Sequence, residues 1–201
     1  MVILPLAYLP SVEYFTYLKQ GNCTIDLGEH FIKRSERNRA RILAPDGVMD
    51  LTVHVCKANR PRTPMREMRL DYSKRWQHQH WGALTASYKA SPYFDHYAEL
   101  LEQFYQHEYH FLVDYNWALL ETLCNQLGIA IPNFSESYID ATEEDLDLRP
   151  KQKEGSAFVA EPYVQVFSDR LPFAPNLSIV DLLFAEGPAA SAVLAQSLRG
   201  K

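Results

Sequence analysis

The chain has 201 residues, 47% of them hydrophobic and 22% charged, which is typical of one globular domain that needs no covalent staples. The formal net charge of −5 argues against general nucleic-acid binding, and we expect no membrane-spanning helix. The widely spaced Cys23, Cys56 and Cys124 form no disulfide framework and predict free thiols in a reducing, cytoplasmic compartment.

The charge is unevenly distributed along the chain. Residues 33–75 carry 12 Lys and Arg against 5 Asp and Glu, a net charge of +7, while the remainder carries −12. A local positive cluster on an acidic protein favours a small anionic ligand over a nucleic acid. A solvated basic surface without a ligand is the alternative.

Extended segments gather in the first third of the chain and return once near its end. Apolar runs and alternating patterns bounded by turn residues predict strands. The expected strands are residues 2–9, 23–27, 31–34, the two arms of a hairpin over 40–55, 68–72 and 163–167. The hairpin turns at Pro45-Asp46-Gly47, where glycine accepts a positive φ.

Helical periodicity occupies the middle of the chain. Trp76, His80, Leu84 and Tyr88 recur four residues apart and therefore share one helix face. The expected helices are residues 12–19, 74–88, 94–106, 111–127, 179–185 and a closing Ala-rich helix. Ser11 is an expected N-cap, Gly128 is an expected stop, and Ser178 and Asp181 are assigned to capping rather than catalysis.

This order of elements predicts one domain over residues 1–201. The strand–helix–strand start, the helical middle section and the late strand–helix pair favour a three-layer α/β fold with a mixed sheet. An α+β fold is the alternative, because the hairpin is antiparallel. Residues 140–156 contain six acidic residues, a proline and no aromatic residue, which predicts a mobile loop.

Several short motifs occur in a characteristic order and spacing. They are Tyr8-Leu9-Pro10, Tyr14-Phe15, Ile25-Asp26, Lys33-x-Ser35-x-Arg37-Asn38-Arg39, Leu51-Thr52-Val53, Trp76-x-x-x-His80, Ser87-Tyr88, Pro92-Tyr93-Phe94, Asn116 and Leu177-Ser178-Ile179-Val180-Asp181. Together they resemble the WbqC-like protein family over about residues 3–187. One departure is His54, where the family tends to have proline.

The resemblance implies a bacterial protein associated with O-antigen and capsule genes. It implies a group transferase that acts on an activated sugar or other anionic precursor in surface-polysaccharide biosynthesis. A non-catalytic partner or scaffold protein of such a complex is the alternative. The expected partner is an anionic small molecule, such as a nucleotide or nucleotide-sugar. Neither a membrane nor a nucleic acid is an expected partner, and any cofactor is unknown.

The basic segment contains the first candidate binding residues. Lys33, Ser35, Arg37, Arg39 and Arg41 alternate, so an extended chain would project them to one side. Such a row could hold a phosphate, pyrophosphate or carboxylate through bidentate contacts. Asn38, on the opposite face, is a further candidate contact. An edge strand protected by positive charge is the alternative.

His80 and Lys33 are the candidate catalytic residues. The position of His80 between Trp76 and Tyr88 predicts a partly apolar pocket and an imidazole that titrates near neutrality. We expect Trp76 and Tyr88 to shape this pocket, and the arginine row to converge on it. A histidine satisfied within the core is the alternative.

Four further residues complete the candidate substrate-binding set. Tyr8 and Pro10 follow the first strand, at the sheet edge where α/β proteins bind ligands. Thr52 lies in the hairpin. Asn116 interrupts a leucine stripe and either lines a cleft or ties its helix to neighbouring backbone, since an unpaired buried amide costs about 1–3 kcal/mol. Hydrolase, P-loop, dinucleotide and zinc motifs are absent from the sequence, and no metal site is expected.

Overall fold

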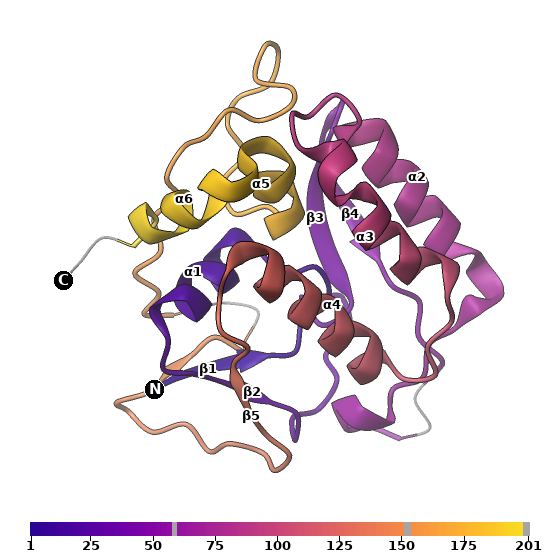
Figure 1. Cartoon of the computed structure of the whole chain (residues 1–201). Helices are drawn as coiled ribbons and strands as arrows, with labels where there is room; N and C mark the ends of the chain where they lie inside the picture. Colours follow the sequence, from indigo (N-terminus) through magenta and orange to yellow (C-terminus); the bar gives the residue numbers. More distant parts are fainter. Residues whose placement is uncertain (58–59, 151–153, 199–201) are drawn as a thin grey trace.

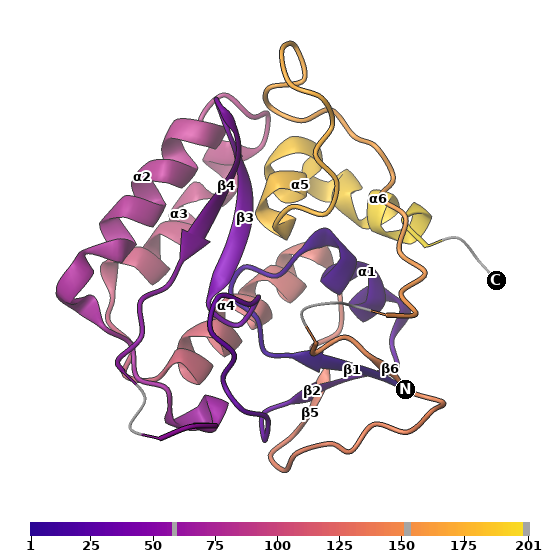
Figure 2. The ribbon, with the colours of Figure 1, turned by 180° about the vertical axis from the view of Figure 1, so that it is seen from behind.

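The computed structural model describes residues 1–57, 60–150 and 154–198 and has an α/β architecture (Figures 1 and 2). A parallel sheet has the strand order β5-β2-β1-β6, and the antiparallel pair β3-β4 forms a separate sheet. The predicted α/β class is confirmed. The hairpin differs from the expectation in that it does not join a mixed sheet.

The parallel sheet is built on the predicted strand–helix–strand unit. Helix α1 (Val12–Gln20) connects β1 (Val2–Pro5) to β2 (Cys23–Asp26), and Ser11 caps its N-terminus as predicted. The short strands β5 (Asn133–Ser135) and β6 (Leu146–Asp147) pair in parallel with β2 and β1. Because every strand of this sheet runs in the same direction, the carboxyl ends meet at one edge.

The hairpin consists of β3 (Arg39–Ala44) and β4 (Gly47–Thr52), and Figure 2 shows it standing apart from the parallel sheet. Gly47 has a φ of 121°, as the predicted turn requires. The hairpin is thus confirmed, within slightly shorter limits than expected.

The helices confirm the periodicity of the sequence. Their bounds are Trp76–Tyr88 (α2), Phe94–Gln106 (α3), Leu112–Leu127 (α4), Ile179–Glu186 (α5) and Ala190–Gln196 (α6). The predicted face of α2 is buried, and Gly128, with a φ of 63°, ends α4. Helices α2 and α5 contact β3, while α1 contacts α5 and α6, as Figure 1 shows.

Three segments expected as strands are irregular, and those predictions are wrong. Residues 31–34 lead into a turn in which Arg34 has a φ of 55°, so the expected alternation is broken. In residues 68–72, Arg69 and Leu70 form isolated bridges, and Tyr72 begins a 3-10 helix, Tyr72–Lys74. Residues 163–167 form no strand, because the chain turns after Gln165, whose carbonyl accepts from the N–H of Ser168. The side chain of Gln165 both donates to and accepts from the backbone of Ala174.

Asp181 is not a capping residue. Ser178 caps α5, whereas the buried carboxylate of Asp181 accepts hydrogen bonds from Tyr88, Tyr163 and Gln165. It therefore ties α5 to α2 and to the irregular 163–167 segment.

Part of the 140–156 segment is built into the fold. Leu146–Asp147 forms β6, and the following Leu148 and Arg149 are buried. Residues 151–153 lie outside the described residues. The mobility of this segment stays a prediction.

One apolar stretch, Ile179–Gln196, is long and apolar enough to cross a membrane by length and composition alone. Half of it is buried inside the fold, and Gly187–Ala189 interrupts it between α5 and α6. Helices α5 and α6 are therefore packed as core helices of this fold.

The three cysteines are free, and they differ in environment. Cys23 and Cys124 are buried, whereas Cys56 is exposed. Burial raises the pKa of Cys23 to about 11 and that of Cys124 to about 12.

Candidate functional site

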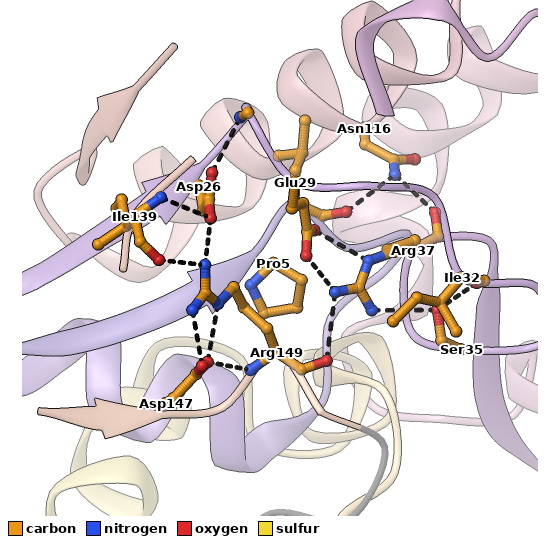
Figure 3. A network of polar contacts seen from close by, with 12 residues as sticks. Pro5, Asp26, Glu29, Ile32, Ser35, Arg37, Asn116, Ile139, Asp147 and Arg149 are labelled. Carbon is orange, nitrogen blue, oxygen red and sulfur yellow. Dashed lines mark hydrogen bonds and ion pairs between the residues drawn. The ribbon is translucent and has the colours of Figure 1, made fainter. Parts of the chain in front are cut away.

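The carboxyl edge of the parallel sheet holds a network of buried ion pairs (Figure 3). Arg37 binds both carboxylate oxygens of Glu29, one of them from Nε at 2.9 Å. Arg149 pairs with Asp26 at the end of β2, and with Asp147 at the end of β6 at 2.7 Å. The two arginines are only 1% and 6% exposed. Carboxylates thus offset the cost of burying both guanidinium groups.

Backbone contacts connect the two arginines to each other and to α4. Arg37 donates from Nη2 to the carbonyl of Arg149 at 3.2 Å. The Nδ2 of Asn116 donates to the carbonyl of Arg37 at 2.8 Å. Of the two alternatives for Asn116, the geometry matches a tie between its helix and neighbouring backbone.

Arg37 and Arg149 also line a cavity of about 750 Å³. Its lining contains the five arginines Arg34, Arg37, Arg39, Arg41 and Arg149 and the two carboxylates Glu13 and Glu36. The volume falls within the range of small-molecule sites. The remainder of its lining includes prolines, a phenylalanine and small polar residues. We call this the arginine-lined cavity.

Strand β3 supplies two of these arginines from alternate positions, as the sequence predicts. Arg39 donates to Thr52 Oγ1 at 3.2 Å and pairs with Asp50 at 2.7 Å. Arg41 donates from Nη2 to the carbonyl of Asn176 at 2.9 Å. Thr52 therefore orients Arg39 from the neighbouring strand.

The rest of the expected row is arranged differently. Lys33 to Arg37 lie in turns, Lys33 is exposed, and it does not line the arginine-lined cavity. Asn38 is buried and donates from Nδ2 to the carbonyl of Val53 at 3.0 Å. The extended row from Lys33 to Arg41 is therefore wrong, because the positive φ of Arg34 reverses the chain.

His80 lies in a buried cluster of aromatic side chains. Its Nδ1 is 2.9 Å from the hydroxyl of Tyr8, which also lies 3.0 Å from the hydroxyl of Tyr105. The ring of Trp76 packs edge-on against the imidazole, with 5.3 Å between the two ring centroids. Burial lowers the pKa of His80 to about 4, although a backbone hydrogen bond at Thr52 opposes the shift. Titration near neutrality is therefore a wrong prediction.

The arginines and the imidazole do not share one pocket. His80, Trp76 and Tyr88 are buried and line neither the arginine-lined cavity nor the small cavity beside it. That small cavity, of about 40 Å³, is where Tyr8 and Pro10 meet Arg39 and Arg41. The expected convergence is thus wrong. Tyr8 separates the two groups, since its hydroxyl contacts His80 while its N–H donates to the carbonyl of Glu36.

Arg149, Glu13 and Asn176 have no place in the sequence-based set of site residues. A weak signal exists for two of them. Arg149 is the first cation after an acidic segment, and Asn176 follows Pro175 in a turn-forming pair, where it adopts a φ of 55°. Glu13 resembles an ordinary first-turn glutamate of a helix.

Fold and cavity together define an α/β protein with an arginine-lined, small-molecule-sized cavity at the carboxyl edge of a parallel sheet. A model of the WbqC-like protein family matches residues 7–156, and the chain belongs to this family. The chain is also 28% identical over 220 residues to the uncharacterized protein Rv1507c of Mycobacterium tuberculosis, covering 94% of this chain and 95% of that protein. No solved structure matches it.

Proposed function

We propose that this protein is a group transferase that acts on an activated sugar or another anionic precursor in surface-polysaccharide biosynthesis. The observation that carries the proposal is the presence of five guanidinium groups in one cavity of small-molecule size. Guanidinium forks bind phosphate and carboxylate bidentately. The anionic part of the precursor binds there.

Four of the five arginines of the cavity form two groups. Arg37 and Arg149 are neutralised by buried carboxylates and act as fixed hydrogen-bond donors. Arg41, by contrast, is exposed and donates to a neutral carbonyl. Arg39 has an exposed partner, Asp50, which water already screens. Arg39 and Arg41 therefore supply the charge that an incoming anion meets.

Isothermal titration with UDP-glucose, UDP and pyrophosphate tests anion binding. We expect Arg41→Ala to weaken the binding of all three ligands roughly tenfold, because each loses one charge-assisted hydrogen bond to a guanidinium group. Arg170→Ala is the matched control, because Arg170 is exposed and the substitution removes one positive charge away from the cavity. Absence of binding to the wild type, or equal losses in both variants, would contradict the proposal.

The scaffold alternative has one observation in its favour. Phe134 and Tyr138 are 51% and 53% exposed, as expected of an interaction surface. In the native bacterium, deletion of the gene followed by complementation with Arg41→Ala separates the two functions. A transferase variant fails to restore the polysaccharide, whereas a scaffold restores it. The catalytic roles of Lys33 and His80 stay predictions.

A further inference from the structure

We infer that the arginine-lined cavity takes a nucleoside diphosphate, free or linked to a sugar, with the diphosphate at Arg39 and Arg41, the ribose at Glu13 and the base against Phe158. This inference rests on the proposed function and names the chemical class of its anionic ligand. Three parts of the cavity lining support it.

The first is an apolar wall. Besides its arginines, the cavity is lined by Phe158, Ala160, Pro150 and Pro175. Inorganic phosphate has no apolar face to pack on such a wall, whereas a flat heterocycle stacks on it. Stacking of a base on an aromatic side chain contributes about 1–3 kcal/mol and tolerates any base.

The position of Phe158 is held by its surroundings. The residue is half-buried and packs against the hydrophobic core. Its N–H donates to Ser156 Oγ at 3.3 Å, and its backbone forms a bridge with Leu198. A side chain fixed in this way is preorganised for a ligand.

The second is a chain of hydrogen bonds from the arginines to Phe158. Arg41 donates to the carbonyl of Asn176 at 2.9 Å, and Asn176 Nδ2 donates to Glu13 Oε2 at 3.0 Å. Ser156 Oγ then donates to Glu13 Oε1 at 2.5 Å. Because Ser156 is two residues before Phe158, the carboxylate of Glu13 lies between the cationic and the apolar ends.

The third is the charge of Glu13 itself. Its side chain is buried, at 6% exposure, and lines a cavity rich in cations. A carboxylate accepts hydrogen bonds, so it suits a hydroxyl-bearing part of the ligand better than the phosphates, which are acceptors themselves. Ribose joins the diphosphate to the base, and its hydroxyl groups donate hydrogen bonds to carboxylates in nucleotide-binding α/β folds.

Titration calorimetry with pyrophosphate, UDP and 2′-deoxy-UDP on the full chain tests the inference. We expect UDP to bind the wild type roughly tenfold more tightly than pyrophosphate, which is the stacking contribution expressed as affinity. Phe158→Ala should remove most of the advantage of UDP over pyrophosphate, leaving only what the ribose contact contributes, and should leave pyrophosphate binding unchanged. Phe134→Ala, an exposed phenylalanine outside the lining of this cavity, is the matched control.

A second variant tests the ribose contact. The wild type should bind UDP more tightly than 2′-deoxy-UDP, and Glu13→Gln should reduce that difference. If Phe158→Ala does not fold, as judged by circular dichroism, Phe158→Leu keeps the apolar volume, removes the aromatic face and gives the same comparison.

The possible failures are distinguishable. If pyrophosphate binds but UDP binds no more tightly, or if both Phe158 variants weaken the two ligands equally, the inference is overturned and anion binding stands. If pyrophosphate, UDP and UDP-glucose all fail to bind, the proposed function fails with it.

Discussion

Two buried polar residues, His80 and Arg149, show two ways in which this protein compensates the cost of burying an ionisable side chain. His80 and Arg149 are both nearly inaccessible to water, yet they meet the cost of burial differently. His80 is shifted towards its neutral form and is held by the hydroxyl of Tyr8. Arg149 stays charged and is surrounded by the carboxylates of Asp26 and Asp147. Each arrangement has a measurable consequence.

For His80 the consequence is acid sensitivity. The pKa of His80 is about 4 in the folded protein, below the ordinary histidine value of 6.5, so protonation favours the unfolded chain. The stability due to neutral His80 is present above pH 6.5 and is lost as the pH falls towards 4. The loss relative to His80→Gln, which cannot titrate, reaches at most about 3 kcal/mol.

Denaturant unfolding at several pH values, with the exposed His78→Gln as control, measures this difference. Glu29 acts in the opposite sense, because burial raises its pKa to about 7 despite Arg37. The comparison is therefore made between wild type and variant rather than on the wild type alone. A difference that does not vary with pH would contradict the prediction.

Arg149→Lys tests the ion-pair network. A lysine cannot reproduce the fork that contacts Asp26, Asp147 and the carbonyl of Ile139, so buried carboxylates lose partners. We expect a loss of about 3 kcal/mol in the free energy of unfolding. The same exchange at the exposed Arg170 should change it by less than about 0.5 kcal/mol. Equal stabilities would show that the network is not structural.

At the scale of elements, close packing at the carboxyl edge of β2 sets a strict limit at Gly28. A Cβ atom there would lie 2.1 Å from the backbone nitrogen of Tyr138. Backbone cannot yield as a flexible side chain does. The loop after β2 and the segment before Ile139 must therefore separate if the glycine is replaced.

Alanine should change the stability of the protein in opposite directions at Gly28 and Gly82. Gly28→Ala should destabilise the protein by about 1–3 kcal/mol through overpacking. Gly82→Ala, in α2 with open space around its Cβ position, should stabilise it by up to about 1 kcal/mol. Thermal unfolding of both variants measures the two effects. A stable Gly28→Ala protein would contradict the packing argument.

The individual helices and strands differ in how well the sequence predicts them. Helices α2 and α4 and the hairpin are local patterns of period 3.6 or 2, and they were predictable within a few residues. The segment 163–167 has the residue pattern of a strand but is irregular, because the chain turns after Gln165 and the side chains of Tyr163 and Gln165 bond to Asp181 and Ala174. Such distant partners leave no periodic signal.

The candidate site was predictable only where its residues follow a local sequence pattern. The alternation of Arg39 and Arg41 follows from their strand, and Arg37 lies in the same basic segment. Arg149, Phe158 and Asn176 reach the cavity from more than 100 residues away in the chain. Only the three-dimensional fold places them there. His80 illustrates the converse, since a helix face indicates burial but not which cavity a side chain faces.

At the scale of the whole molecule, the cavity depends on more than the region that matches the family model. The match ends at residue 156, whereas Phe158, Pro175 and Asn176 line the cavity from beyond it. Helices α5 and α6 pack on α1, which carries Glu13. The C-terminal section therefore helps to form the cavity. The cytoplasmic location stays a prediction.

The distribution of the cysteines gives the native chain an unusual practical property. Because only the thiolate is reactive and burial keeps Cys23 and Cys124 protonated, Cys56 should react first. We expect Ellman's reagent to modify one thiol per chain rapidly in the folded protein and all three after unfolding, and Cys56→Ser to abolish the rapid phase. A rapid phase of two or three thiols would contradict this. A maleimide dye would then attach at one known point, so ligand titrations could be followed by fluorescence without any engineered cysteine.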